Sequence, residues 1–84
     1  MVKKRSNKIG LVVYHSDLNE YSFLVEVLST TLGYHPTQAQ VCANQILLNG
    51  EYLVRSFHVK DYQRARALYE VLIKNEIPTE LLPM

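Results

Sequence analysis

The sequence predicts a small α+β fold, a two-layer sandwich in which a three-stranded antiparallel sheet packs on three helices. Three observations support this prediction. The 84 residues are enough for one domain with a modest core. The hydrophobic patterns along the chain follow the order β-α-α-β-α-β. Elements of this kind bury their apolar faces as a sheet covered by helices.

The first predicted strand covers Ile9–Tyr14, whose letters IGLVVY are rich in β-branched and aromatic residues. We expect residues 1–7 to be a flexible N-terminal arm and residues 8–84 to be a single domain. Positive charge concentrates at the start of the chain, on Lys3, Lys4, Arg5 and Lys8. Such a cluster is typical of a solvated chain start, and it does not by itself predict a nucleic-acid site.

The first predicted helix follows the polar joint 15–20. Asn19 is its expected N-cap, and Glu20 lies in the first turn, where its charge suits the helix dipole. Gly33 is expected to end the helix. The apolar residues repeat with a helical period, which predicts one buried face: Tyr21, Leu24, Val25, Leu28 and Leu32. Leu28 lies at the centre of that face.

The second predicted helix begins at Pro36, since proline suits the first helical position, and it ends at Asn49-Gly50. Its expected buried face comprises Ala39, Cys42, Ala43, Ile46 and Leu47. Cys42 is the single cysteine, so the chain has no internal disulfide framework. No basic group adjoins Cys42 in the sequence, and we expect a small core residue, not a reactive thiol.

The C-terminal part predicts a strand over Glu51–Phe57, with Val59 as its outer limit, and a third helix that begins at Asp61. Pro78 is expected to stop this helix. Leu81-Leu82 forms a brief last strand before Pro83. The buried stripe of the third helix is expected to comprise Tyr62, Ala65, Tyr69, Leu72 and Ile73.

Composition and motifs argue against several classes of function. The net charge of +1 gives no global field that would recruit nucleic acid or membrane. No apolar run approaches the roughly 18 residues that span a bilayer, and no signal peptide is recognisable, so we expect a cytoplasmic protein. Paired carboxylates and a phosphate-binding loop are missing, and His15, His35 and His58 lack metal-ligand spacing. We therefore predict a non-enzymatic protein without metal or cofactor.

The order and spacing of several motifs resemble the Clp protease adaptor family, ClpS, over about residues 8–82. A typical member has a hydrophobic strand, then Asn-Asp-Asp, a helix start and Phe-Val-x-x-x-Leu. This chain has VVY, His15-Ser16-Asp17 and then FLVEVL from Phe23. The match continues through Gly33, Ala39, Gly50 and Ala67. The ribosomal stalk protein's C-terminal domain has a related architecture, so the fold alone does not settle the function.

The resemblance implies an adaptor that holds a substrate's bulky N-terminal residue and passes it to a Clp ATPase. In the family, an Asn, an Asp and a His grip the α-amino group. By position these correspond to His15, Ser16 and Leu47, and all three differ, while Asp17 matches the second Asp. The gate of the hydrophobic pocket corresponds to Tyr21. The pocket wall corresponds to Leu24, Ala43 and Ile46.

The resemblance also places a docking surface for the ATPase. A Glu and a Lys that some members use there correspond to Lys60 and Ala65, so both charges have changed. We predict a non-enzymatic protein-binding adaptor that modulates substrate delivery to a Clp ATP-dependent protease, with an altered N-degron pocket. Its partners would be a Clp ATPase, substrate N-terminal peptides or both, with no nucleic acid and no membrane.

Two alternatives stay open at this point. The same fold could serve as an interaction module for another protein partner, without degron recognition. An RNA-contacting domain that uses the basic arm would instead show the steep salt dependence of phosphate neutralisation. The polar joint 15–20 is likewise open to two interpretations. It occupies the family's site, but Ser, Asp and Asn are also the residues that ordinary turns and helix starts prefer.

Overall fold

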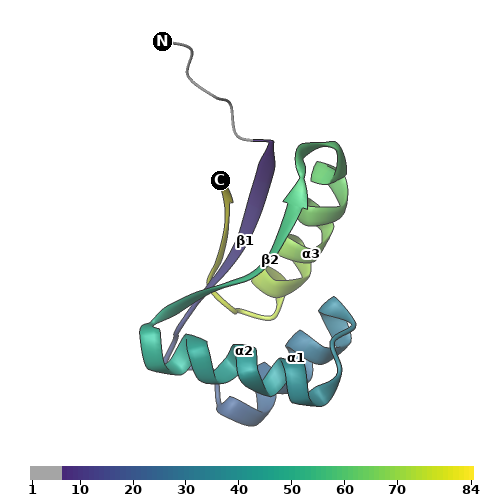
Figure 1. Cartoon of the computed structure of the whole chain (residues 1–84). Coiled ribbons are helices and arrows are strands. Elements are labelled where there is room, and N and C mark those ends of the chain that lie inside the picture. Colours follow the sequence, from purple (N-terminus) through teal and green to yellow (C-terminus); the bar gives the residue numbers. More distant parts are fainter. Residues whose placement is uncertain (1–6) are drawn as a thin grey trace.

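The computed structural model describes residues 7–84, and its elements follow the predicted order (Figure 1). They are β1 (Lys8–Tyr14), α1 (Tyr21–Leu32), α2 (Pro36–Asn49), β2 (Glu51–His58), the 3₁₀ turn η1 (Val59–Asp61), α3 (Tyr62–Lys74) and β3 (Thr79–Pro83). The predicted α+β class, with three helices and a three-stranded antiparallel sheet, is confirmed.

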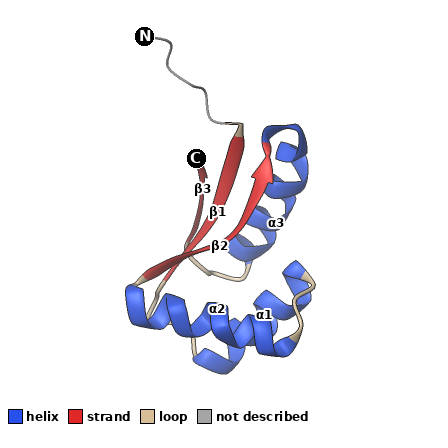
Figure 2. Ribbon diagram, in the orientation of Figure 1, coloured by secondary structure: helices blue, strands red, loops and turns tan. Residues whose placement is uncertain are grey.

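The sheet has β1 in its centre, with the order β2-β1-β3, and both pairings are antiparallel (Figure 2). Gly10 pairs with Ser56 of β2 on one side and with Leu82 of β3 on the other. The register with β2 shifts between Leu11 and Val12, which marks a bulge. Because successive side chains of a strand point to opposite faces, this register fixes which residues face the helices.

The core lies between the sheet and the helices. Leu11 and Val13 of β1 are fully buried, and together with Leu28 and Leu72 they belong to one cluster. Leu28 and Leu72 are both 0% exposed, which confirms that they lie on the predicted buried faces of their helices. Cys42 is also buried in this cluster, and burial raises the pKa of its thiol, so its expected role as a core residue is confirmed.

The predicted helix faces are wrong at four residues. Tyr21, Leu47, Tyr62 and Ile73 are exposed by 38–44%. Tyr21 and Tyr62 are the first residues of their helices, and Ile73 precedes the last residue of α3, so these side chains extend beyond the packed layer. On α2 the buried arc is narrower than predicted and comprises Ala39, Cys42, Ala43 and Ile46.

Several predicted boundaries also need correction. Glu20, not Asn19, is the N-cap of α1, and it makes no side-chain capping bond. β1 begins one residue earlier than expected, at Lys8, and β3 begins at Thr79. The expected arm lies almost entirely outside the described residues, although the carbonyl of Asn7 accepts a hydrogen bond from the Val59 N–H at 2.8 Å.

α3 ends before Pro78, at Lys74, because the chain turns there through a left-handed residue. Glu76 has φ 62°, the Glu76 N–H donates to the carbonyl of Ile73 at 2.9 Å, and the Ile77 N–H donates to the carbonyl of Leu72 at 3.0 Å. This pattern is a Schellman motif, in which glycine is the usual residue. Because Glu occupies the position, the sequence did not announce this helix end.

Candidate functional site

The polar joint between β1 and α1 is a compact turn held by its own backbone and by its neighbours. The His15 N–H donates to the carbonyl of Gly50 at 2.8 Å, which ties the joint to the end of α2. Within the joint, the Ser16 hydroxyl oxygen accepts from the Leu18 N–H at 3.2 Å, and the Ser16 carbonyl accepts from the Asn19 N–H at 3.1 Å. The Ser16 side chain is therefore engaged in the turn itself.

His15 and Asp17 lie side by side on the surface of this turn. The His15 Nε2 and Asp17 Oδ1 atoms are 3.3 Å apart, and the contact becomes an ion pair when the imidazole is protonated. The Asp17 side chain is fully exposed. Both groups could accept a hydrogen bond from a ligand, but at present they face each other.

The residues at the family's pocket positions fall into two groups. Leu24, Ala43 and Ile46 are buried together in the core cluster between α1, α2 and the sheet. Tyr21 and Leu47 are each 38% exposed. The structure thus brings the three wall residues together, but it packs them against one another and the rest of the core.

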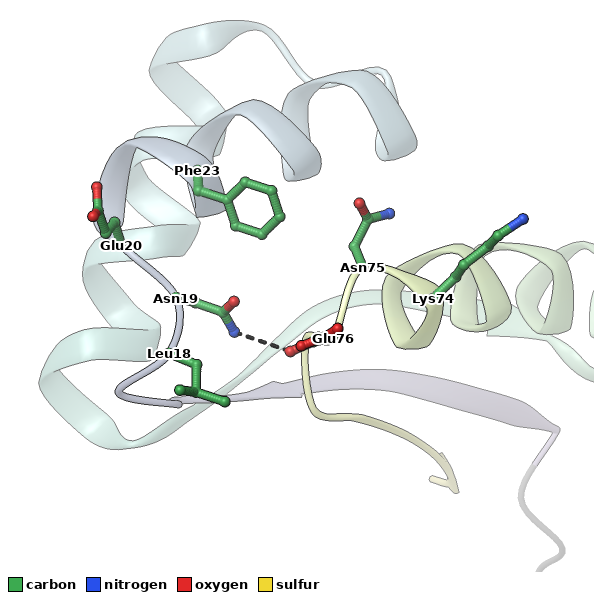
Figure 3. Close-up of a pocket in the computed structure, with 7 residues that line it drawn as sticks. All are labelled: Leu18, Asn19, Glu20, Phe23, Lys74, Asn75 and Glu76. Atoms are coloured by element: carbon green, nitrogen blue, oxygen red, sulfur yellow. Dashed lines mark hydrogen bonds between the residues drawn. The ribbon is translucent and has the colours of Figure 1, made fainter.

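A cavity lies beside the joint, on the side of α3 (Figure 3). Its volume is about 500 Å³. It is lined by Leu18, Asn19, Glu20, Phe23, Lys74, Asn75 and Glu76. None of the eight residues that the sequence nominated for peptide binding is among them.

The two walls of the cavity are linked by one hydrogen bond, which Figure 3 draws between Asn19 and Glu76. The Asn19 Nδ2 donates to the carbonyl of Glu76 at 3.4 Å, across 57 positions of the sequence. The Phe23 ring projects into the space between α1 and the end of α3 (Figure 3). Sequence reasoning missed this place because no local motif joins residues so far apart.

The chemistry of the cavity is mixed. The Phe23 ring offers an apolar, electron-rich face, while Glu20 and Glu76 carry carboxylates and Lys74 carries an ammonium group. An aromatic face and carboxylates suit a ligand that combines an apolar part with a positive charge. The sequence carries no local signal for this place, because the left-handed position at the end of α3 is occupied by Glu76 and not by glycine.

The two predicted docking positions differ in accessibility. Lys60 lies exposed in η1, where its backbone N–H donates to the His58 Nδ1 at 3.1 Å. Ala65 is 0% exposed on the inner face of α3. A side chain without exposed surface makes no contact with a partner, so only Lys60 of this pair is available.

Within residues 7–84, no group of three or more His, Cys, Asp and Glu side chains could hold a metal ion. In the same part of the chain, no helix has the length and apolar character needed to cross a membrane.

The fold matches a solved structure over almost its whole length. Agrobacterium tumefaciens ClpS2 bound to L-phenylalaninamide superposes with a TM-score of 0.77 and 10% sequence identity, covering 95% of this chain and 100% of that chain. No protein-family model matches the sequence, and no curated protein matches it. At 10% identity the likeness establishes a ClpS-like fold.

Proposed function

We propose that this chain is a non-enzymatic, protein-binding adaptor that modulates substrate delivery to a Clp ATP-dependent protease, with an altered site for N-terminal residues. One observation carries the proposal: the fold matches ClpS2 over 95% of this chain and 100% of that one. The spacing of the motifs in the first loop and α1 resembles the same family, although no family model matches the sequence.

The family-position site is expected to bind an N-terminal amine weakly. A buried ammonium group needs acceptors that stay in place. Leu47 offers none, and the Ser16 hydroxyl already accepts from Leu18. Each lost hydrogen bond to a charged group is worth roughly 1.5–3 kcal/mol, so two losses weaken binding by about a hundredfold or more.

The neighbouring cavity offers a second position for the same ligand chemistry. L-phenylalaninamide, the ligand of ClpS2, carries an aromatic side chain beside a free amino group. In this chain an apolar side chain could pack on Phe23 while the amine faces the Glu76 carboxylate. Binding there would leave the core residues Leu24, Ala43 and Ile46 in place.

Fluorescence anisotropy with labelled peptides beginning with Leu, Phe, Tyr or Trp tests the proposal. We expect weak binding that disappears when the N-terminus is acetylated. The paired variant Ser16→Asp with Leu47→His restores the missing acceptors and should gain affinity if the ligand uses the family position. Phe23→Ala should lose affinity if the ligand uses the cavity, and exposed Leu48→Ala on α2 is the matched control. Binding that ignores acetylation would contradict the proposal.

Docking to the usual Clp ATPase N-terminal domain is expected to be weak or absent. Lys60 reverses the expected charge, and like charges across an interface cost several kcal/mol. Titration calorimetry with that domain measures the affinity directly, and Lys60→Glu should increase it. Tight binding by the unmodified chain would show that the docking face uses other residues.

A second candidate is a ClpS-like interaction module for another protein partner, without degron recognition. The close packing of Leu24, Ala43 and Ile46 favours it, because these wall positions leave little surface for a ligand side chain. Two results together would favour this candidate. Peptides would bind equally well with a free and an acetylated N-terminus, and a pull-down from the native cytosol would capture no Clp ATPase subunits.

A further inference from the structure

The face of the sheet that points away from the core carries an apolar strip across all three strands. The register and the alternation of side chains place Val12, Leu53, Leu82 and Met84 on this face, around Gly10. Leu53 is 41%, Leu82 37% and Met84 49% exposed. An antiparallel sheet that faces water is normally polar on its outer side, so this strip is unusual.

Gly10 lies at the centre of the strip and lets its neighbours lie flat. A Cβ atom at Gly10 would lie 2.8 Å from the Leu53 Cδ1 and 3.3 Å from the Met84 Sδ. The side chains of β2 and of the C-terminus thus meet over the backbone of the central strand. The result is a low, continuous apolar surface suited to packing against another flat sheet.

The charges around the strip are divided between its two ends. Glu51 pairs with Tyr14 at one end of β1, and Glu80, opposite Val12, lies on the same outer face near that end. Lys8 and His58, which are opposite each other in the register of β1 and β2, lie at the other end. The outer face is therefore acidic at one end, apolar in the middle and basic at the other.

From this arrangement we infer that the outer face is a self-association surface whose occupant is a second copy of this chain. The two-fold axis lies between the two sheets, parallel to them and perpendicular to the strands. It places the acidic end of each copy opposite the basic end of the other, with the two apolar strips in contact. The same surface then serves both copies, as a closed two-fold dimer requires. The helical layer and the cavity stay free for a protein partner.

The size of the face sets the expected strength. Seven residues of β1 extend about 23 Å and three strands span roughly 14 Å, so each copy contributes about 300 Å² of flat sheet plus its projecting side chains. Two such faces bury about 1,000 Å² or less in total, the lower limit of specific interfaces. The dimer is therefore weak and dependent on concentration.

The edge of β2 is a poorer surface for association. The Tyr34 hydroxyl, from the loop between α1 and α2, donates to the Val54 carbonyl, and the Arg55 Nη2 donates to the Leu32 carbonyl at 3.1 Å. The first contact occupies a backbone carbonyl of β2, which hinders the addition of another strand there.

Sedimentation velocity from micromolar to millimolar concentration tests the inference on the full chain. We expect a reversible monomer–dimer equilibrium that Leu53→Asp abolishes and that Leu48→Asp, at an exposed leucine of α2, leaves unchanged. Thermal melting of each variant verifies that it is folded, and Leu82→Asp replaces Leu53→Asp if the latter unfolds. A monomer at every concentration, or a dimer disrupted only by Leu48→Asp, would overturn the inference.

Charge exchange tests the antiparallel orientation. Lys8→Glu alone and Glu51→Lys alone each place like charges at both symmetric contacts, so each should weaken the homodimer about tenfold or more. When the two variant chains are mixed, both contacts become attractive again and a heterodimer should form. Dimerisation that ignores these exchanges, and a mixture that stays as weak as its components, would refute the arrangement.

Discussion

The joint 15–20 is hydrogen-bonded to the C-terminal ends of two helices, α2 and α3. Each end has a left-handed residue, but the two residues differ in type. At the end of α2, the His15 N–H donates to the carbonyl of Gly50, a glycine with φ 83°. At the end of α3, the Asn19 side chain donates to the carbonyl of Glu76, a left-handed glutamate with φ 62°. One support is relaxed and the other is strained, and the cavity lies beside the strained one.

The two helix ends therefore differ in how well their residue suits a left-handed backbone. A left-handed glutamate is less favourable than glycine and persists only where the surroundings hold it. Here the fully buried Ile77 and Leu72 fix the backbone around it. The left-handed conformation of Glu76 is the one that the Schellman motif at the end of α3 requires.

The largest expected effect is on the core that supports the two helix ends. Leu72→Ala under the strained end and Leu28→Ala in α1 should each lower the free energy of unfolding by roughly 2–5 kcal/mol, because both side chains are fully buried. Urea unfolding followed by circular dichroism measures this. An Ala variant that melts within about a degree or two of the parent would show that its residue does not support the core.

The second-largest effect is expected from a substitution at Gly50, the left-handed glycine at the end of α2. A Cβ at Gly50 would meet no atom within 4 Å, so Gly50→Ala tests the backbone conformation alone. We expect a loss of about 1–2 kcal/mol in unfolding free energy, because non-glycine residues resist the left-handed region. Gly33→Ala, at the left-handed end of α1 where a Cβ also meets no atom, is the matched control for the size of this effect. An unchanged stability would mean that the α2 end carries no such preference.

A substitution at Glu76, the left-handed residue after α3, should change the free energy of unfolding in the opposite direction. Glu76→Gly removes the left-handed penalty but adds freedom to the unfolded chain, so we expect a net gain of about 0.5–1 kcal/mol. Glu76→Ala separates the loss of the carboxylate from the relief of strain, since alanine keeps the penalty. If Glu76→Gly destabilised the fold as much as Glu76→Ala, the carboxylate and not the backbone would dominate at this position.

The same contrast explains how much of the fold could be predicted. The ends of α1 and α2 could be predicted from Gly33 and Gly50, and the start of α2 from Pro36, because the preferred conformations of these residues are local properties. The end of α3 was placed too late because its left-handed residue is Glu76, and Pro78 was the visible stop signal. The prediction of Asn19 as the cap is wrong because its partner, the Glu76 carbonyl, is distant in sequence.

The candidate site divides in the same way. Periodicity placed Leu24, Ala43 and Ile46 correctly on inner helix faces. Their expected role as a pocket wall came from the resemblance, and it remains a prediction. The sequence does not predict the cavity, because its two walls, at the start of α1 and at the end of α3, are far apart in the chain. Long-range contacts of this kind leave no periodic signal.

The smallest expected effect concerns Tyr14, the residue before the joint, which ties it to the α3 side. The Tyr14 N–H donates to the Pro78 carbonyl at 2.9 Å, and its hydroxyl donates to the Glu80 Oε1 at 2.6 Å. That hydrogen bond, more than partial burial or the nearby carboxylates, raises the pKa of Tyr14 from 10.0 to about 12. The neutral phenol is therefore favoured in the folded state.

Because the folded pKa of Tyr14 lies above the unfolded value, its contribution to stability is complete below pH 10.0 and is lost as the pH rises to about 12. The difference in urea midpoint between the parent and Tyr14→Phe should be constant up to the lower pH and vanish near the upper one. Tyrosinate absorbance should show one late-titrating tyrosine that Tyr14→Phe removes. Glu80→Gln should advance its titration, since an amide can also donate to the phenolate. If a late-titrating tyrosine is still present in Tyr14→Phe, the raised pKa belongs to another tyrosine. The hydrogen bond from Tyr14 to Glu80 would then not contribute to stability as proposed.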